Sequence, residues 1–200
     1  MALRDPDKTR SNILMVAATN FHQKGFKGTS LSEILQQADI SKGALYHHFT
    51  NKQELLYAVI DEVYKSCFLS RWQHILVDEN PIEAISQTVK SLADEGSDEE
   101  MCRGCPIHNL AAEMASTDEQ VRKRIDALYC EIKSIIQQGF ETAIDKKQVS
   151  SEIDSQQVAL FFMCSLNGIP QMVKSCQERE VFVQLTSALS DYVLRFRMDK

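Results

Sequence analysis

The residues best suited to chemistry in this 200-residue chain are concentrated between positions 29 and 52. Two short helical patterns are joined there by a three-residue turn, which is typical of a helix-turn-helix. The N-terminus of a short helix can enter the major groove of DNA, where its backbone N–H groups and dipole favour phosphate. Small residues allow close backbone approach, and longer polar side chains then reach the DNA. The residues that fit these roles are Gly43 and Ala44 as the small pair, Tyr46 and His47 as the long pair, and Lys52 for a phosphate.

A second candidate site lies at residues 102–115, where Cys105 opens a predicted helix. A helix N-terminus stabilises a thiolate, which favours a reactive cysteine. Pro106 weakens this effect because it has no N–H to direct at the sulfur. Lys174 is a candidate partner if its helix packs across the thiol. The alternative is that Cys105 is a small packing residue beside Gly104.

Metal binding and catalysis both lack residues that they require. Cys102 and Cys105 have only His108 nearby as a third ligand, whereas structural zinc takes four. The pair Cys105 and His108 also lacks an orienting third residue that the sequence can assign. The chain shows no phosphate-cradling glycine loop, zinc-protease motif or nucleophile elbow. We therefore expect no metal, no cofactor, no catalytic residue and no enzymatic activity, and an enzyme is the remote alternative.

The elements that position these residues are predicted to be helical throughout, because apolar residues recur every three or four positions. Gly25 ends the first helix as a C-cap, and the capping box Ser30–Glu33 begins the second. An acidic loop is expected at 94–100, a second capping box at 117–120, and a break at 168–170. The fold class is all-α, with helices at about 9–24, 31–38, 42–48, 52–67, 82–93, 106–115, 119–140, 154–173 and 182–196.

Charge is distributed unevenly along the chain. The net charge is −6, but residues 1–52 carry +3 and the remainder −9, so only the front is suited to a polyanion. No apolar run approaches the ~18 residues of a membrane span, and none follows the charges of residues 1–10. A cytoplasmic or nuclear chain with reduced thiols is expected. Three cysteines lie in apolar helical stretches and are expected to act as small hydrophobes: Cys67, Cys130 and Cys164.

Apolar residues spread around much of the predicted eighth helix, which indicates burial on two faces. One face is suited to cover a ligand pocket, and the other to meet a partner subunit in a seam shared with the ninth helix. The alternative is that both faces belong to a monomer core. The expected seam residues are Phe161, Phe162, Phe182, Leu185, Leu189 and Tyr192.

The segments 28–34, 41–49 and 51–52 together resemble the TetR family of bacterial transcriptional regulators, over about residues 9–65. Asp39 stands where that family usually has glycine, and Asp tolerates the left-handed conformation. The resemblance implies a DNA-binding domain over 1–52 with its helix-turn-helix at about 30–49. It implies an effector-binding and dimerisation domain over 53–200. The expected protein is a homodimer, usually a repressor, that leaves a palindromic operator when a small molecule binds.

The resemblance also implies roles for single residues. Contacts with the DNA phosphates or backbone are implied for Thr29, Ser30, Tyr46 and Lys52. Positions that face the groove are implied for Lys42, Gly43, Ala44 and His47. Core positions are implied for Leu45 and Phe49. His48 fits either a packed position or a phosphate contact. Residues 102–115 resemble a Gly-Cys-x-x-x-Asn-Leu-Ala-x-Glu segment found in a subgroup of the family. Some members of that subgroup respond to electrophiles or oxidants through the cysteine, which makes thiol sensing through Cys105 the alternative function.

Overall fold

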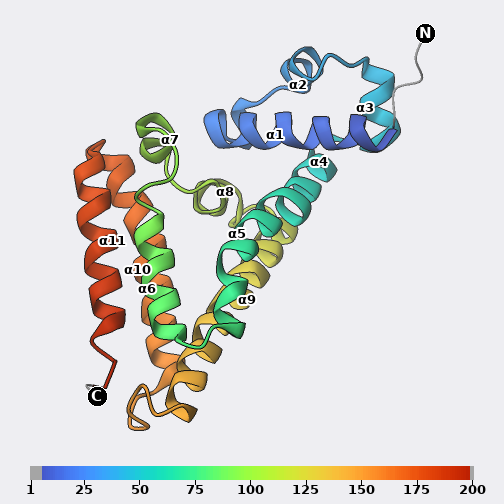
Figure 1. Ribbon diagram of the computed structural model, residues 1–200. Helices are drawn as coiled ribbons and strands as arrows, with labels where there is room; N and C mark the ends of the chain where they lie inside the picture. Colours follow the sequence, from blue (N-terminus) through green and yellow to red (C-terminus); the bar gives the residue numbers. More distant parts are fainter. Residues whose placement is uncertain (1–5, 199–200) are drawn as a thin grey trace. The chain divides into compact units, whose positions relative to one another are not determined.

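The computed structural model describes residues 6–198, and the fold is all-α as predicted. Residues 1–5 and 199–200, including the start of the predicted DNA-binding domain, lie outside the described residues. The helices are α1 (Pro6–Gly28), α2 (Leu31–Gln37), α3 (Lys42–His48), α4 (Lys52–Ala58), α5 (Lys65–Trp72), α6 (Pro81–Ser91), α7 (Asp98–Arg103), α8 (Pro106–Met114), α9 (Glu119–Asp145), α10 (Ser155–Cys176) and α11 (Arg179–Leu194) (Figure 1). A π-helical segment, η1 (Val59–Tyr64), joins α4 to α5, and a 3-10 segment, η2 (Gln73–Val77), follows.

The described chain forms two compact units that do not follow a single linear boundary. The first unit comprises the described residues up to Cys67 together with Pro106–Asp126, and the second comprises Phe68–Cys105 and the described residues from Ala127 onward. The helix α8 and the first residues of α9 therefore belong to the first unit, although more than one helix separates them from the helix-turn-helix in the sequence.

The first unit is built around α1, which contacts α2, α3 and α4. Ile13 and Phe21 of α1 are buried, as are Ile34 of α2 and Leu45 of α3. Full burial of such a side chain contributes about 1.5–3 kcal/mol, so these contacts hold the short helices in place. Helices of seven residues are not stable alone, and this shared core is what orders α2 and α3.

Local signals explain where the helices of the first unit begin and bend. Gly25 adopts φ 75° and ψ 169°, which interrupts the regular helix near the predicted C-cap, although α1 continues to Gly28. Ser30 and Glu33 form the predicted capping box at the start of α2. Asp39 lies in the turn with φ 51°, the left-handed conformation expected at this position.

The second unit has its core between α6, α10 and α11, and α11 contacts both of the others. The Trp72 and Phe162 rings meet edge to face, with centroids 5.7 Å apart, and both side chains are buried. At Gly139 of α9 an added Cβ would lie 2.9 Å from Ile75 Cγ2, so only glycine allows this close packing. Within the described residues, β pairing is limited to an isolated antiparallel bridge between Val149 and Arg197.

Three details of the sequence prediction are wrong. The expected acidic loop at 94–100 contains the start of α7, which Ser97 and Glu100 begin with a capping box. The helix α10 continues through Pro170 instead of breaking there. The cap of α9 is Asp118 rather than Thr117, because the Asp118 carboxylate accepts from the N–H groups of Gln120 and Val121.

In the part of the chain that the structure describes, no helix is both long and apolar enough to cross a membrane.

Candidate DNA-binding surface

The helix α3 has one buried face and one exposed face. Leu45 and Phe49 are buried, as predicted for core positions. Lys42 is exposed at the first helical position, and Tyr46 is 44 % exposed one turn later. His47 is exposed beside it. The short helix therefore presents a cation and two long polar side chains on the side opposite its core.

The N-terminal end of α3 is open to close approach. Ser41 caps it by accepting a hydrogen bond from the Ala44 N–H, at 3.2 Å. Gly43 is exposed, and a Cβ added there would meet only the Ser41 hydroxyl, at 3.9 Å. Internal packing therefore does not require glycine at this position. Ala44 is half-buried.

The two residues expected to contact phosphate at the start of α2 differ in exposure. Ser30 is exposed, and its hydroxyl accepts from the Glu33 N–H at 3.2 Å. Thr29 is only 1 % exposed, and its hydroxyl donates to the Gly25 carbonyl at 2.8 Å. The structure thus corrects the expectation for Thr29, whose side chain holds the end of α1 instead of facing solvent.

Glu33 is held as a carboxylate by its neighbours. The Lys24 ammonium donates to it at 2.7 Å, and the Ser30 N–H and hydroxyl donate to its other oxygen. These contacts, led by Lys24, lower the pKa of Glu33 to about 2. The capping box therefore keeps its charge at any pH in the ordinary working range.

Lys52 and His48 are less exposed than simple phosphate contacts. The Lys52 ammonium lies 4.3 Å from the centroid of the Phe26 ring. Burial lowers its pKa, while the carboxylates of Glu113 and Glu33 oppose that shift. His48 is half-buried, and burial followed by the charge of His47 lowers its pKa.

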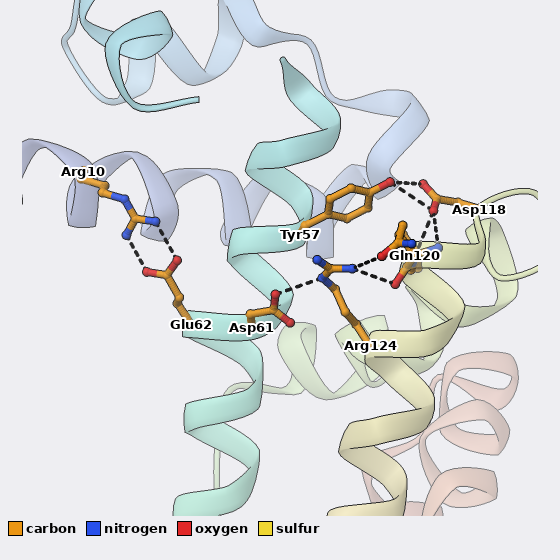
Figure 2. Close-up of polar contacts among 8 residues, drawn as sticks. Arg10, Tyr57, Asp61, Glu62, Asp118, Gln120 and Arg124 are labelled. Atoms are coloured by element: carbon orange, nitrogen blue, oxygen red, sulfur yellow. Dashed lines mark hydrogen bonds and ion pairs between the residues drawn. The ribbon is translucent and has the colours of Figure 1, made fainter. Parts of the chain in front are cut away.

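A polar cluster that the sequence did not predict joins α4 and η1 to the start of α9 (Figure 2). The Tyr57 hydroxyl donates to Asp118 Oδ2 at 2.9 Å, and Gln53 Nε2 donates to the same oxygen. Arg124 Nε donates to Asp61 Oδ2 at 2.9 Å, and its guanidinium lies 4.5 Å from the Tyr57 ring centroid. Burial raises the pKa of Asp118, but the hydrogen bonds outweigh it and the net shift is downward.

A separate ion pair joins α1 to η1 (Figure 2). The Arg10 guanidinium donates to both carboxylate oxygens of Glu62, at 2.5 and 2.6 Å. A bidentate pair of this kind restricts orientation more than a single contact does. Polar contacts in the first unit thus join α1 to η1 and α4 to the start of α9.

Comparison of the sequence with known protein families shows which family this chain belongs to. Residues 13–59 match the family described as bacterial regulatory proteins of the tetR family, and residues 81–189 match the tetracyclin repressor-like C-terminal domain. The second match alone covers more than half of the chain. The chain belongs to the TetR family. Its members are DNA-binding transcriptional regulators, and neither the family nor the fold is that of an enzyme.

Individual relatives agree with this assignment. An uncharacterised HTH-type regulator from the lacX 3' region of Lactococcus lactis is 29 % identical over 134 residues, or 64 % of this chain and 66 % of the relative. The repressor NemR of Escherichia coli K12 is 25 % identical over 139 residues, or 66 % and 67 %. A TetR-family structure from Cytophaga hutchinsonii superimposes with a TM-score of 0.86 at 21 % identity, covering both chains completely. The match to the Lactococcus relative spans less than two thirds of that protein.

The segment around Cys105 lies between α7 and α8, where Gly104 adopts φ 77°. Cys105 is half-buried, whereas Cys67, Cys130 and Cys164 are exposed, so the expectation that those three act as small hydrophobes among their apolar neighbours is wrong. Gln177 Nε2 donates to the carbonyls of Cys102 and Lys174, at 3.1 and 2.6 Å. The end of α10 is therefore close to this segment.

The predicted seam residues of this TetR-family chain divide into two groups. Phe161 is 54 % exposed, and Phe182, Leu185 and Tyr192 are partly exposed. Phe162 and Leu189 are buried in the second unit, so they are not available to a partner and their placement in the seam is corrected.

In residues 6–198, no three His, Cys, Asp or Glu side chains converge in a group that could hold a metal ion.

Proposed function

We propose that this protein is a homodimeric repressor that binds a palindromic operator through α3 and leaves it when a small molecule binds the C-terminal unit. The observation that carries the proposal is the two-sided character of α3. Its buried face fixes the helix, while Lys42, Tyr46 and His47 are exposed on the other side. Such a helix is suited to the major groove.

Exposed apolar residues on α10 and α11 support dimerisation. Leu160, Phe161 and Met172 on α10 are each more than half exposed, and Val183 on α11 is 39 % exposed. Large exposed apolar side chains on two helices that contact each other are typical of a protein interface. Effector release rests on membership of a family whose C-terminal match is described as tetracyclin repressor-like.

Selection of DNA from a random pool tests this proposal. We expect the enriched sequences to contain an inverted repeat, because a two-fold dimer presents two α3 helices to two half-sites. The half-sites should be separated by about one helical turn or a multiple of it. Enrichment of a single unrepeated site, or of no sequence at all, would contradict the proposal.

Thiol sensing through Cys105 is a second candidate, and one observation favours it. The Tyr129 hydroxyl is buried without a hydrogen-bond partner. Burial and then the nearby Cys105 raise the pKa of Tyr129, so it stays protonated and able to donate to a thiolate. The Gln177 contacts also bring the end of α10, which carries Lys174, towards the cysteine segment.

Alkylation of the native protein tests the second candidate. Cys105 is expected to react faster than the exposed Cys67, Cys130 and Cys164, because a sensor thiol is stabilised as a thiolate. Exposure alone would give the opposite order of rates. Alkylation should release operator DNA, and Cys105→Ser should abolish release without loss of DNA affinity. Slower reaction of Cys105, or release that persists in Cys105→Ser, would leave it as a packing residue.

A further inference from the structure

Glu113 of α8 holds the end of α1, which directly precedes the helix-turn-helix in the chain. Phe26 N–H donates to Glu113 Oε2 at 2.9 Å, and Lys27 N–H donates to Oε1 at 2.8 Å. These two amides follow the interruption of α1 at Gly25. A Cβ added at Gly25 would lie 2.7 Å from Glu113 Oε2, so the carboxylate fills the space over that glycine.

Asp118, which caps α9, holds α4, the helix that follows the helix-turn-helix in the chain. One carboxylate oxygen caps α9, and the other accepts from Tyr57 and Gln53 of α4. The Asp118 side chain therefore caps α9 and also binds α4. The turn before it is closed by bonds from the Thr117 and Asp118 N–H groups to the Met114 carbonyl, at 3.0 and 2.8 Å.

Glu113 and Asp118 are five positions apart in the sequence. Glu113 binds the end of α1 and Asp118 binds α4, and α2 and α3 lie between these two segments in the chain. The two held segments also meet directly, because the Lys52 ammonium lies over the Phe26 ring. We propose that Glu113 and Asp118 are positioning residues that fix the orientation of α3 for operator binding. This inference rests on the proposed function.

The proposal predicts that replacing Glu113 or Asp118 weakens operator binding, whereas the change in charge alone would strengthen it. Removal of an acidic charge near a DNA-binding surface should by itself strengthen binding to DNA. If α3 loses its fixed orientation, a smaller fraction of the molecules can bind the operator. The apparent Kd for the operator then rises by the inverse of that fraction. The two effects can therefore be told apart by the direction of the change.

The experiment compares Glu113→Ala, Asp118→Asn and Tyr57→Phe on the inverted repeat that the wild type selects. Operator affinity is expected to fall by about tenfold for Glu113→Ala, which removes the acceptor of two amides. Tyr57→Phe, which leaves the α9 cap intact, should show a smaller loss in the same direction. Affinity for random DNA should not fall and the salt slope should remain, because the lysines are unchanged.

Asp154→Asn is the matched control, because Asp154 caps α10 in the second unit by accepting from the Gln157 N–H at 3.0 Å. It should leave operator affinity unchanged. Hydrogen exchange at Phe26 and Lys27 should accelerate in Glu113→Ala. Operator affinity that is equal to or higher than wild type in all three variants would overturn the inference. Failure of the wild type to prefer the repeat would instead overturn the proposed function.

Discussion

Phe162→Ala is expected to destabilise the second unit by about 3–5 kcal/mol, the usual cost of emptying a phenylalanine site in a core. Phe162 is fully buried and packs edge to face on Trp72, so the substitution leaves a cavity and removes an aromatic contact. Urea unfolding followed at equal protein concentration measures the loss. Equal concentration matters because dimerisation contributes to apparent stability.

The neighbouring Phe161 provides the matched comparison. Its side chain is 54 % exposed and touches Tyr192, with ring centroids 5.1 Å apart. Phe161→Ala should cost much less stability and should instead weaken the dimer in sedimentation. A large stability loss from Phe161→Ala, with little from Phe162→Ala, would reverse the assignment of the two faces of α10.

Local signals in the sequence were sufficient for the helix-turn-helix. The capping box of α2, the cap of α3 and the alternation of Leu45 with exposed neighbours are set by residues within one or two turns. The positive φ of Asp39 follows from the same local chemistry. These features were predicted because they depend little on distant parts of the chain.

Contacts between distant segments were not predictable in the same way. Glu113 meets Phe26 across 87 positions, and no periodicity indicates such a pairing. Apolar spacing also could not separate Phe161 from Phe162, because both belong to a helix that is apolar around much of its surface. The exposed Cys67, Cys130 and Cys164 show the same limit, since neighbouring apolar residues do not reveal which way one side chain points.

Lys42→Ala is expected to weaken operator binding by about 30-fold at ~0.15 M salt, because a dimer loses two groove-facing cations and the counterions that each displaces from the DNA. The slope of log affinity against log salt should flatten by about 1.8 for the same reason. Lys42 is exposed at the first position of α3, 5.8 Å from the Tyr46 ring centroid, so its loss leaves the core intact.

The salt dependence of operator binding by Lys42→Ala, measured beside Lys90→Ala, tests most directly whether α3 contacts the DNA. Lys90 is an exposed lysine on α6 of the second unit and controls for the loss of one positive charge. The account predicts weaker operator binding with a flatter salt dependence for Lys42→Ala. It predicts wild-type affinity and a wild-type salt slope for Lys90→Ala. Wild-type affinity and slope in Lys42→Ala would contradict the assignment of α3 as the DNA-binding helix.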